Sequence, residues 1–338
     1  MLRASPRASE REEVRAGVVG ERYVLTEHVI YQGLASTIFL AVERGTFLQV
    51  AIKAVVKSKL GTGQERAQAV AELEIHSSIP PHANVVQLLA AVETPSAILL
   101  VTPYTPCGDL WELTRYGQTY CEAEVRHCAA QMLGSIHHIH AACNLIHGDI
   151  KPHNFLLFNI GGRHAVQLCD FGLAEHPDSP AGTATFRGLR GTSGWFAPEM
   201  LEHHDYGQAV DLFGAGLILY RMLGGYPPFD PPSRFREPLD FDDRYWCHVS
   251  PACRLLLARL LALDPAERGP ARESCEHEWL RGPAPAQPSP EQLRALAAFG
   301  PPPSADVRFW PPAEVPEVPG SRAGQDCAEP QQLAMDVA

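Results

Sequence analysis

The hydrophobic pattern of the chain changes near residue 105, and this change indicates two structural units in series. Between residues 23 and 104, short apolar runs with strand-like periodicity alternate with one segment of helix formers, at residues 64–79. Beyond that point helical spacing dominates, as in Val125, Ala129, Met132, Leu133, Ile136 and Ile139. The pattern predicts an α+β chain with a small strand-rich lobe and a larger, mainly helical lobe.

The strand-like runs of the first lobe place a lysine on a regular strand. Residues 37–44 and 47–56 follow a period of two, with a hairpin turn at residues 43–47. This period puts Ile38, Leu40 and Val42 on one face, and Ala51 with Lys53 on another. Two more strands are expected after the helix, at residues 85–93 and 97–104.

The overall charge and the cysteine pattern exclude several classes of protein. A formal net charge of -11 repels polyphosphate backbones and anionic membrane surfaces, so neither nucleic acid nor a membrane is an expected partner. No apolar run approaches the roughly 18 residues that a membrane-spanning helix needs. The nine cysteines are scattered, without the spacing of a zinc site, which favours reduced thiols in an intracellular protein of the cytosol or nucleus.

The two ends of the chain have the composition of disordered tails. Residues 1–20 are charged and aperiodic, and residues 282–338 are rich in Pro, Ala and Gly, apart from a short helix expected near residues 291–299. One globular domain is therefore expected at residues 21–281, divided into lobes of about 21–105 and 106–281. The PEVP segment (316–319) fits weak docking to an SH3-like groove, although a spacer is the simpler interpretation of a Pro-rich tail.

Four short motifs follow one another in a characteristic order. They are VAIK (50–53), HGDIKPHN (147–154), DFG (170–172) and APE (197–199). Their order and spacing resemble the signature set of the protein kinases, over about residues 21–281. The resemblance implies the two-lobed kinase fold, with an antiparallel sheet and one helix in the small lobe. It also implies ATP and Mg²⁺ as ligands and a protein as substrate.

The resemblance assigns a role to each charged residue of the motifs. Lys53 would hold the α- and β-phosphates of ATP, and Glu72, or alternatively Glu74, would fix the lysine. Asp149 would orient the substrate hydroxyl and accept its proton, and Asn154 and Asp170 would bind magnesium. Lys151, which would act on the γ-phosphate, indicates a serine/threonine kinase, and Thr192 indicates the same.

The remaining nucleotide contacts also follow from the resemblance. Gly33, Ile38 and Ala51 would contact ATP from the first lobe. Thr102 takes the gatekeeper position, Pro103 would offer a carbonyl to adenine, and Thr105 would offer its amide. Asp109 falls either on the ribose or at a helix N-cap, and the sequence does not decide between these two roles.

Scaffold roles are also implied by the resemblance. Asp211 would brace the catalytic loop, and Glu199 would pair with Arg268. His147 would be a packed core residue. The segments at residues 225–229 and 263–272 are similar to those of the calcium/calmodulin-dependent group.

Two departures from the family pattern leave an alternative function open. Tyr31 and Ser36 replace two glycines of the phosphate-binding loop. In the family pattern, glycines at these positions let the backbone approach the phosphates closely. Gly148 replaces the arginine that in many relatives pairs with an activation-loop phosphate, so activity should not require that phosphate. The alternative is a pseudokinase that acts as a nucleotide-binding scaffold, against which the complete set of catalytic residues argues.

Overall fold

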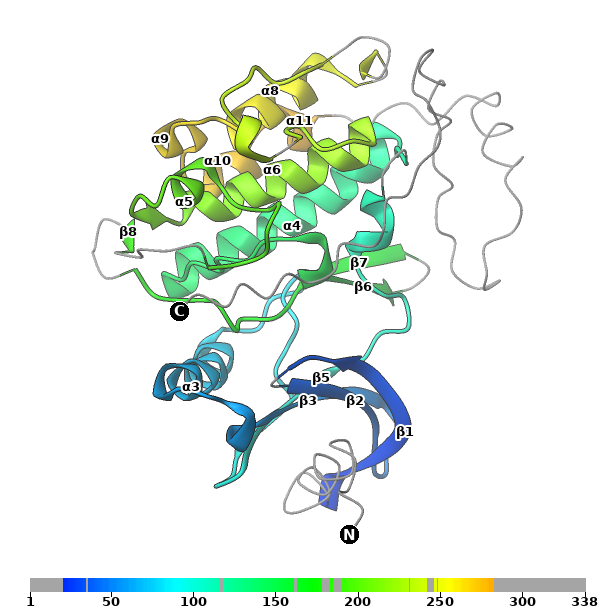
Figure 1. The fold of residues 1–338 in the computed structure, drawn as a ribbon. Coiled ribbons are helices and arrows are strands. Elements are labelled where there is room, and N and C mark those ends of the chain that lie inside the picture. Colours follow the sequence, from blue (N-terminus) through cyan, green and yellow to red (C-terminus); the bar gives the residue numbers. More distant parts are fainter. Residues whose placement is uncertain are drawn as a thin grey trace, which may run out of the picture.

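The computed structural model describes residues 21–34, 36–115, 118–160, 163–177, 183–184, 190–230, 232–241, 246–247 and 249–282. The chain forms a small strand-rich lobe and a larger helical lobe, as Figure 1 shows with the small lobe below. The small lobe contains β1 (Tyr23–Gln32), β2 (Ser36–Glu43), β3 (Gln49–Val56), η1 (Lys57–Lys59), α3 (Gly63–Ser78), β4 (Ala90–Glu93) and β5 (Ala97–Pro103). The expected α+β division is confirmed.

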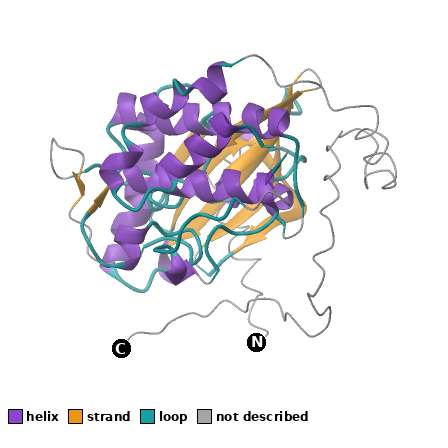
Figure 2. Ribbon diagram, turned by 90° about the horizontal axis from the view of Figure 1, so that it is seen from above, coloured by secondary structure: helices purple, strands orange, loops and turns teal. Residues whose placement is uncertain are grey.

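The large lobe is built around two long helices. It contains η2 (Leu110–Thr114), α4 (Glu122–Cys143), η3 (Pro152–Asn154), β6 (Phe155–Ile160), β7 (Arg163–Leu168), β8 (Thr183–Ala184), α5 (Pro198–Leu201), β9 (Tyr206–Gly207), α6 (Ala209–Gly224), η4 (Pro232–Arg234), α8 (Pro251–Leu260), α9 (Pro265–Arg268), α10 (Ala271–Cys275) and α11 (Glu278–Arg281). Viewed from the side of this lobe, its helices cover the strands behind them (Figure 2).

The five strands of the small lobe form one antiparallel sheet in the order β1-β2-β3-β5-β4. Ile38 pairs with Lys53 and Leu40 pairs with Ala51. Because paired residues of an antiparallel ladder lie on the same side of a sheet, these four residues share one face. The expectation that Ala51 and Lys53 lie on a different face is therefore wrong, and the opposite face carries the buried Phe39 and Ile52.

The segment before β4 is shorter as a strand than the sequence predicts. Residues 85–93 were expected to be one strand, but β4 begins only at Ala90. The preceding residues turn toward the other lobe, where the Val86 amide donates to the Leu168 carbonyl at 2.9 Å. Backbone groups that bond across the lobes in this way are not available to the β4–β5 ladder.

Helix α3 starts and ends where its sequence directs. The Thr62 side chain accepts from the Glu65 amide, and the Glu65 side chain accepts from the Thr62 amide, which forms a capping box. The helix ends at Ser78, with Ile79 as an extended C-cap. By the resemblance to the kinase family, a helix that ends at this position favours Glu72 over Glu74 as the partner of Lys53.

Helices α4 and α6 form the centre of the large lobe. The apolar stripe of α4 is fully buried, as predicted, and α6 is buried along almost its whole length. A Cβ on Gly214 of α6 would lie 2.8 Å from the Ile150 carbonyl oxygen, so glycine is needed for the close approach of α6 to the catalytic loop. The catalytic loop thus packs directly against α6 in the core of the large lobe.

The tails expected at residues 1–20 and 282–338, with the helix near 291–299 and the PEVP segment, lie outside the described residues, apart from Gly282. Among the described residues, no helix is both long and apolar enough to cross a membrane.

Candidate active site

Lys53 joins the two lobes through a pair of carboxylates. Its Nζ lies 2.6 Å from Glu72 Oε1 on α3 and 2.9 Å from Asp170 Oδ1 of the DFG segment. Glu72 is buried, whereas Glu74 is exposed, so the structure selects Glu72 as the partner. The side chain of Lys53 is therefore restrained by β3 at its base and by two carboxylates at its ammonium group. A restrained lysine is positioned in advance for binding phosphate.

The charges of this triad are strongly coupled. Burial disfavours the ammonium of Lys53, but the two carboxylates outweigh that effect and the pKa of Lys53 lies above its ordinary value. The charge of Lys53 holds the pKa of Asp170 at about 2. Burial raises the pKa of Glu72, an effect that Lys53 opposes. Asp170 is therefore a carboxylate at neutral pH, as a metal ligand must be.

The DFG segment is held in place by its phenylalanine. Phe171 is buried between the rings of His76 and His147, at centroid distances of 4.9 and 5.4 Å. His76 Nε2 lies 2.8 Å from the Val86 carbonyl oxygen, and burial lowers the pKa of His76. Asp170 has a φ of 62°, a left-handed conformation that this packing maintains.

The carboxylate of Asp149 has three side-chain neighbours in the catalytic loop and the segment that follows DFG. Lys151 Nζ donates to Asp149 Oδ2 at 2.6 Å, and Thr192 Oγ1 donates to Asp149 Oδ1 at 2.9 Å. Lys151 Nζ also donates to Thr192 Oγ1 at 2.6 Å. Asn154 Nδ2 donates to the Asp149 main-chain oxygen at 2.8 Å. The structure thus brings together the side chains of Asp149, Lys151, Asn154 and Thr192.

Asp211 of α6 holds the catalytic loop through hydrogen bonds to its backbone. Its carboxylate accepts from the amides of His147 at 2.8 Å and Gly148 at 2.9 Å, and it lies 2.8 Å from His140 Nε2. His147 is fully buried and its Nε2 lies 3.1 Å from the Cys169 carbonyl oxygen, in agreement with a packed core residue. Gly148 has a φ of 75°, which favours glycine at this position.

A second buried ion pair anchors the APE segment. Arg268 donates to both carboxylate oxygens of Glu199, at 2.6 and 2.8 Å, and both residues are buried. This geometry confirms the expected pairing, and its bidentate form is one that only arginine provides.

The residues that the resemblance assigns to the nucleotide lie on β2, β3 and β5 and in the segment after β5. Ala51 pairs with Thr102 across β3 and β5, next to the pair of Ile38 with Lys53. Pro103 ends β5. The Thr105 hydroxyl donates to the Leu157 carbonyl and accepts from the Cys107 amide, which fixes the connection between the lobes.

Asp109 caps the helix η2, because its Oδ1 accepts from the Trp111 amide at 2.8 Å. Burial raises the pKa of Asp109. The N-cap role is therefore present, and only the second carboxylate oxygen is left for a ribose contact, which remains a prediction.

Tyr31 lies against the remaining glycine of the phosphate-binding loop. A Cβ built on Gly33 would lie 3.1 Å from Tyr31 Cε1 and 3.4 Å from the Tyr31 hydroxyl oxygen. The Gly33 amide donates to the Ser36 carbonyl at 2.8 Å, and Tyr31 is half exposed. This amide is thus used inside the β1–β2 turn.

The geometry agrees with the comparison to known proteins. A family model described as "Protein kinase domain" matches residues 25–280. The chain belongs to the protein kinase family. It is 33% identical over 260 residues to calcium/calmodulin-dependent protein kinase type 1B of Rattus norvegicus, which covers 75% of this chain and 73% of the relative. It is also 31% identical over 256 residues to the calcium/calmodulin-dependent protein kinase type II alpha chain of Drosophila melanogaster, covering 74% of this chain and 47% of that relative.

These relatives place the kinase in the serine/threonine class, in the calcium/calmodulin-dependent-kinase-like group. The family generally uses ATP and Mg²⁺, and its members act on proteins. The comparisons do not favour the pseudokinase alternative over this function.

The donor set of the cleft fits a magnesium ion. Asp170 offers a partly exposed carboxylate, and Asn154 offers its amide oxygen because its Nδ2 is used by Asp149. Within the described ranges, no group of three or more His, Cys, Asp or Glu residues could hold a metal. A site with few protein ligands is typical of magnesium bound together with nucleotide phosphates.

The sequence did not reveal three residues that hold this site together. Gln68 of α3 donates to the Gly172 carbonyl at 2.6 Å, and Arg190 contacts both Gln68 and Glu175. His76 lies four residues after Glu72, so helical spacing would have placed both side chains on the cleft side of α3. The contacts of Gln68 with Gly172 and Arg190 span more than 100 residues and leave no local signal.

Proposed function

We propose that this kinase transfers the γ-phosphate of ATP to serine and threonine hydroxyls of protein substrates, and that the residues of the cleft between the lobes carry out this transfer. The observation that carries the proposal is the position of Lys53, which contacts Glu72 and Asp170 at once. This contact sets α3, β3 and the DFG segment in one arrangement. A site arranged before substrate binds needs no costly reorganisation during the reaction.

The transfer makes one bond and breaks one bond. The substrate hydroxyl oxygen attacks the γ-phosphorus, the bond to the β–γ bridging oxygen breaks, and the hydroxyl proton passes to Asp149. Lys151 places its positive charge next to Asp149. This charge would neutralise part of the negative charge on the phosphoryl group during transfer. Thr192 fixes the orientation of both side chains.

Lys53 would bind the α- and β-phosphates, while Asp170 and Asn154 would hold magnesium, which when bound neutralises the charge on the phosphate oxygens. Adenine would lie against Ile38 and Ala51, with Thr102 at the back. Its edge would meet the Pro103 carbonyl and the Thr105 amide, and Asp109 would accept from the ribose. Gly33 would lie over the phosphates. These contacts use the shared face of β2 and β3 and the chain segment after β5.

The proposed place of action is intracellular, in the cytosol or nucleus. Eight of the nine cysteines belong to the described residues, and all eight are free thiols. Free thiols in this number suit a reducing compartment.

The test is transfer of radiolabelled phosphate from ATP with magnesium to a generic protein substrate, followed by phosphoamino acid analysis. Glu72→Gln and Glu74→Gln form a matched pair, because they remove the same charge from the same helix but only Glu72 contacts Lys53. We expect Glu72→Gln, Asp149→Asn and Asp170→Asn each to lower kcat/KM by about 10²-fold or more, and Glu74→Gln to leave it within about twofold.

Labelled serine or threonine that disappears with Asp170→Asn would support the proposal. No transfer above the Asp170→Asn background, from protein with an intact thermal unfolding transition, would overturn it. Equal loss in Glu72→Gln and Glu74→Gln would refute the role of the Lys53 contact.

A further inference from the structure

Arg221, on the C-terminal part of α6, is a partly buried cation to which the described residues offer no carboxylate partner within ion-pair distance. Its Nε is buried and has no hydrogen-bond partner, and its side chain makes no ion pair with any residue that the structure describes. Asp230 is the acidic group that acts on it most directly, but the two do not form an ion pair. Burial lowers the pKa of Arg221, although a guanidinium still keeps its proton at neutral pH.

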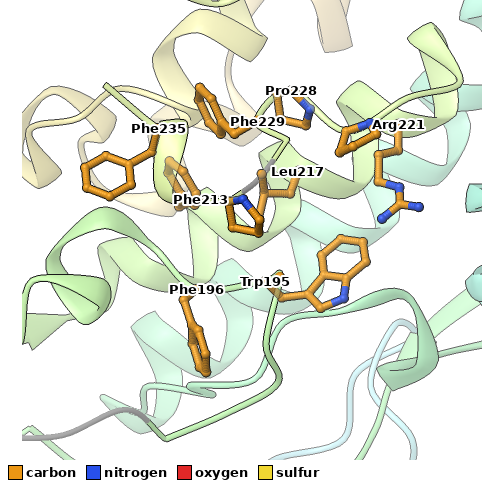
Figure 3. Close-up of a pocket in the computed structure, with 11 residues that line it drawn as sticks. Trp195, Phe196, Phe213, Leu217, Arg221, Pro228, Phe229 and Phe235 are labelled. Atoms are coloured by element: carbon orange, nitrogen blue, oxygen red, sulfur yellow. The ribbon is translucent and has the colours of Figure 1, made fainter. Parts of the chain in front are cut away.

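Two tryptophans hold this cation in a fixed position. Arg221 Cζ lies 5.4 Å from the centroid of the Trp195 ring and 5.9 Å from that of the Trp111 ring, both within the range of a cation–π contact. Figure 3 shows the guanidinium directed toward Trp195 at the end of an apolar wall. Leu217, Pro228 and Phe229 also line this small pocket. The stacking fixes the plane of the guanidinium while its N–H groups keep their hydrogen-bonding capacity.

Both tryptophans belong to segments that adjoin the catalytic loop. Trp111 stacks on His153, with ring centroids 4.6 Å apart and an interplanar angle of 21°, and His153 follows Lys151 by two residues. The Trp195 amide donates to the Thr192 carbonyl at 3.1 Å, and Thr192 contacts Asp149. Arg221 is therefore linked to the catalytic loop through Trp195 and Thr192 on one side and through Trp111 and His153 on the other.

The other charges nearby are already engaged or absent. Glu112 forms an ion pair with Arg115, and the Asp109 Oδ1 accepts from the amide of Trp111. Arg221 is thus a cation on this wall that forms no ion pair with any described residue, in a chain whose formal net charge is -11.

An unpaired and partly desolvated guanidinium costs free energy unless a ligand satisfies it. A carboxylate accepts two parallel hydrogen bonds from a guanidinium, which is the strongest pairing available to it in a protein substrate. We infer that Arg221 is a specificity residue that binds an aspartate or glutamate side chain of the protein substrate near the phosphorylated residue. This inference rests on the proposed function.

The test measures kcat/KM on a set of peptides with one serine, in which a single Glu, Gln or Lys is moved through each position from five before to four after the serine. The Glu to Gln ratio at each position is compared between the wild type, Arg221→Gln, Arg221→Glu and Arg221→Lys. Arg272→Gln is the matched control, because Arg272 is an exposed arginine on α10 of the same lobe.

We expect one position at which Glu exceeds Gln by about tenfold in the wild type, as for a charge-assisted hydrogen bond. The Glu to Gln ratio should fall to about one in Arg221→Gln and be partly kept in Arg221→Lys. In Arg221→Glu it should fall below one, and the peptide with Lys at this position should be a better substrate than the peptide with Gln. Arg272→Gln should keep the wild-type ratio. A purely structural role of Arg221 would lower all rates together and leave the ratio unchanged.

Two results would overturn the inference. One is a wild-type profile without any preference for Glu, including a profile in which an apolar residue is preferred. The other is a preference for Glu that Arg221→Gln leaves intact. If neither the peptides nor a generic protein substrate are phosphorylated, the proposed function fails. In that case, fluorescence anisotropy measures the Kd of labelled Glu and Gln peptides for the wild type and for Arg221→Gln. A preference for Glu that disappears in Arg221→Gln would support the binding site, and an unchanged preference would overturn it.

Discussion

The buried pair of Glu199 and Arg268 allows a prediction of stability from the geometry of the site. Arg268 is 0% exposed and Glu199 is 5% exposed, and two hydrogen bonds of 2.6 and 2.8 Å join them. Glu199→Gln keeps the shape of the side chain and removes its charge. The arginine then remains buried with an uncompensated charge, which costs about 3–5 kcal/mol in proteins. Because Gln keeps one hydrogen-bond acceptor, we expect a loss at the lower end of this range, about 3 kcal/mol of the free energy of unfolding.

Equilibrium unfolding in urea and thermal melting both measure this loss. For a domain of this size about 3 kcal/mol corresponds to a fall in Tm of about 6–12 °C. Glu276→Gln is the matched control, because Glu276 pairs with Arg272 at the surface, with side chains 42% and 71% exposed. Such a pair contributes about 0–1 kcal/mol, so this variant should melt within about 3 °C of the wild type.

The reasoning would be refuted if Glu199→Gln and Glu276→Gln lowered stability equally. A second variant tests the cause of the loss. Arg268 also donates to the carbonyl oxygens of Ala209, Ala262 and Leu263, at 3.0, 2.9 and 3.3 Å. Arg268→Gln therefore removes the guanidinium that bonds these three carbonyl groups in addition to leaving the carboxylate unpaired, and it should destabilise the domain more than Glu199→Gln does.

Three further predictions follow from the same structure. Replacing Thr183 and Thr185, both in the expected activation loop at residues 176–193, together by Ala should keep at least about half of the wild-type kcat/KM, measured by phosphate transfer, because contacts of Glu175 and Arg190 hold the two ends of this segment without phosphate. The ionised form of Asp170 has a folded pKa of about 2, below its ordinary value, so the stability that it provides is present above about pH 4 and is lost as the pH falls toward 2. The difference in urea midpoint between the wild type and Asp170→Asn should therefore shrink between pH 5 and pH 3, and a constant difference would contradict this. Burial raises the pKa of Cys169, so iodoacetamide at pH 7.5 should label the exposed Cys247 first, as peptide mass spectrometry would show, and faster labelling of Cys169 would refute this order.

The chemistry of the site could be predicted from the sequence because its residues occur in short motifs with fixed spacing. The resemblance favoured Glu72 over Glu74 because Ile79 then falls where the family's helix ends, and the contact of Lys53 with Glu72 agrees with that choice. The face of Lys53 was mistaken because a period of two orders residues within one strand and does not give the register between strands. That register depends on the turn at residues 43–47, where Gly45 and Phe47 both have positive φ.

Other features depend on contacts that no local pattern encodes. The packing of Tyr31 on Gly33 depends on the rotamer of one side chain, and the pocket around Arg221 is formed by segments about 80 and 110 residues apart in the chain. In the sequence, Arg221 is, with Asp211, one of two charged positions in an otherwise largely apolar helix. That it forms no ion pair with the described carboxylates becomes visible only in the folded structure.

The replacement of the usual arginine by Gly148 is consistent with the way in which the activation segment is held. The Glu175 and Ile146 backbones exchange hydrogen bonds of 2.8 and 2.9 Å, which fix the first end of this segment to the catalytic loop. At the other end, Arg190 binds the Glu175 carboxylate and the Gln68 side chain. An activation-loop phosphate in other kinases supplies an anion that organises cations from α3 and the catalytic loop. Here Glu175 supplies the anion and Arg190 the cation, so the described part of this segment is held without a cation at position 148.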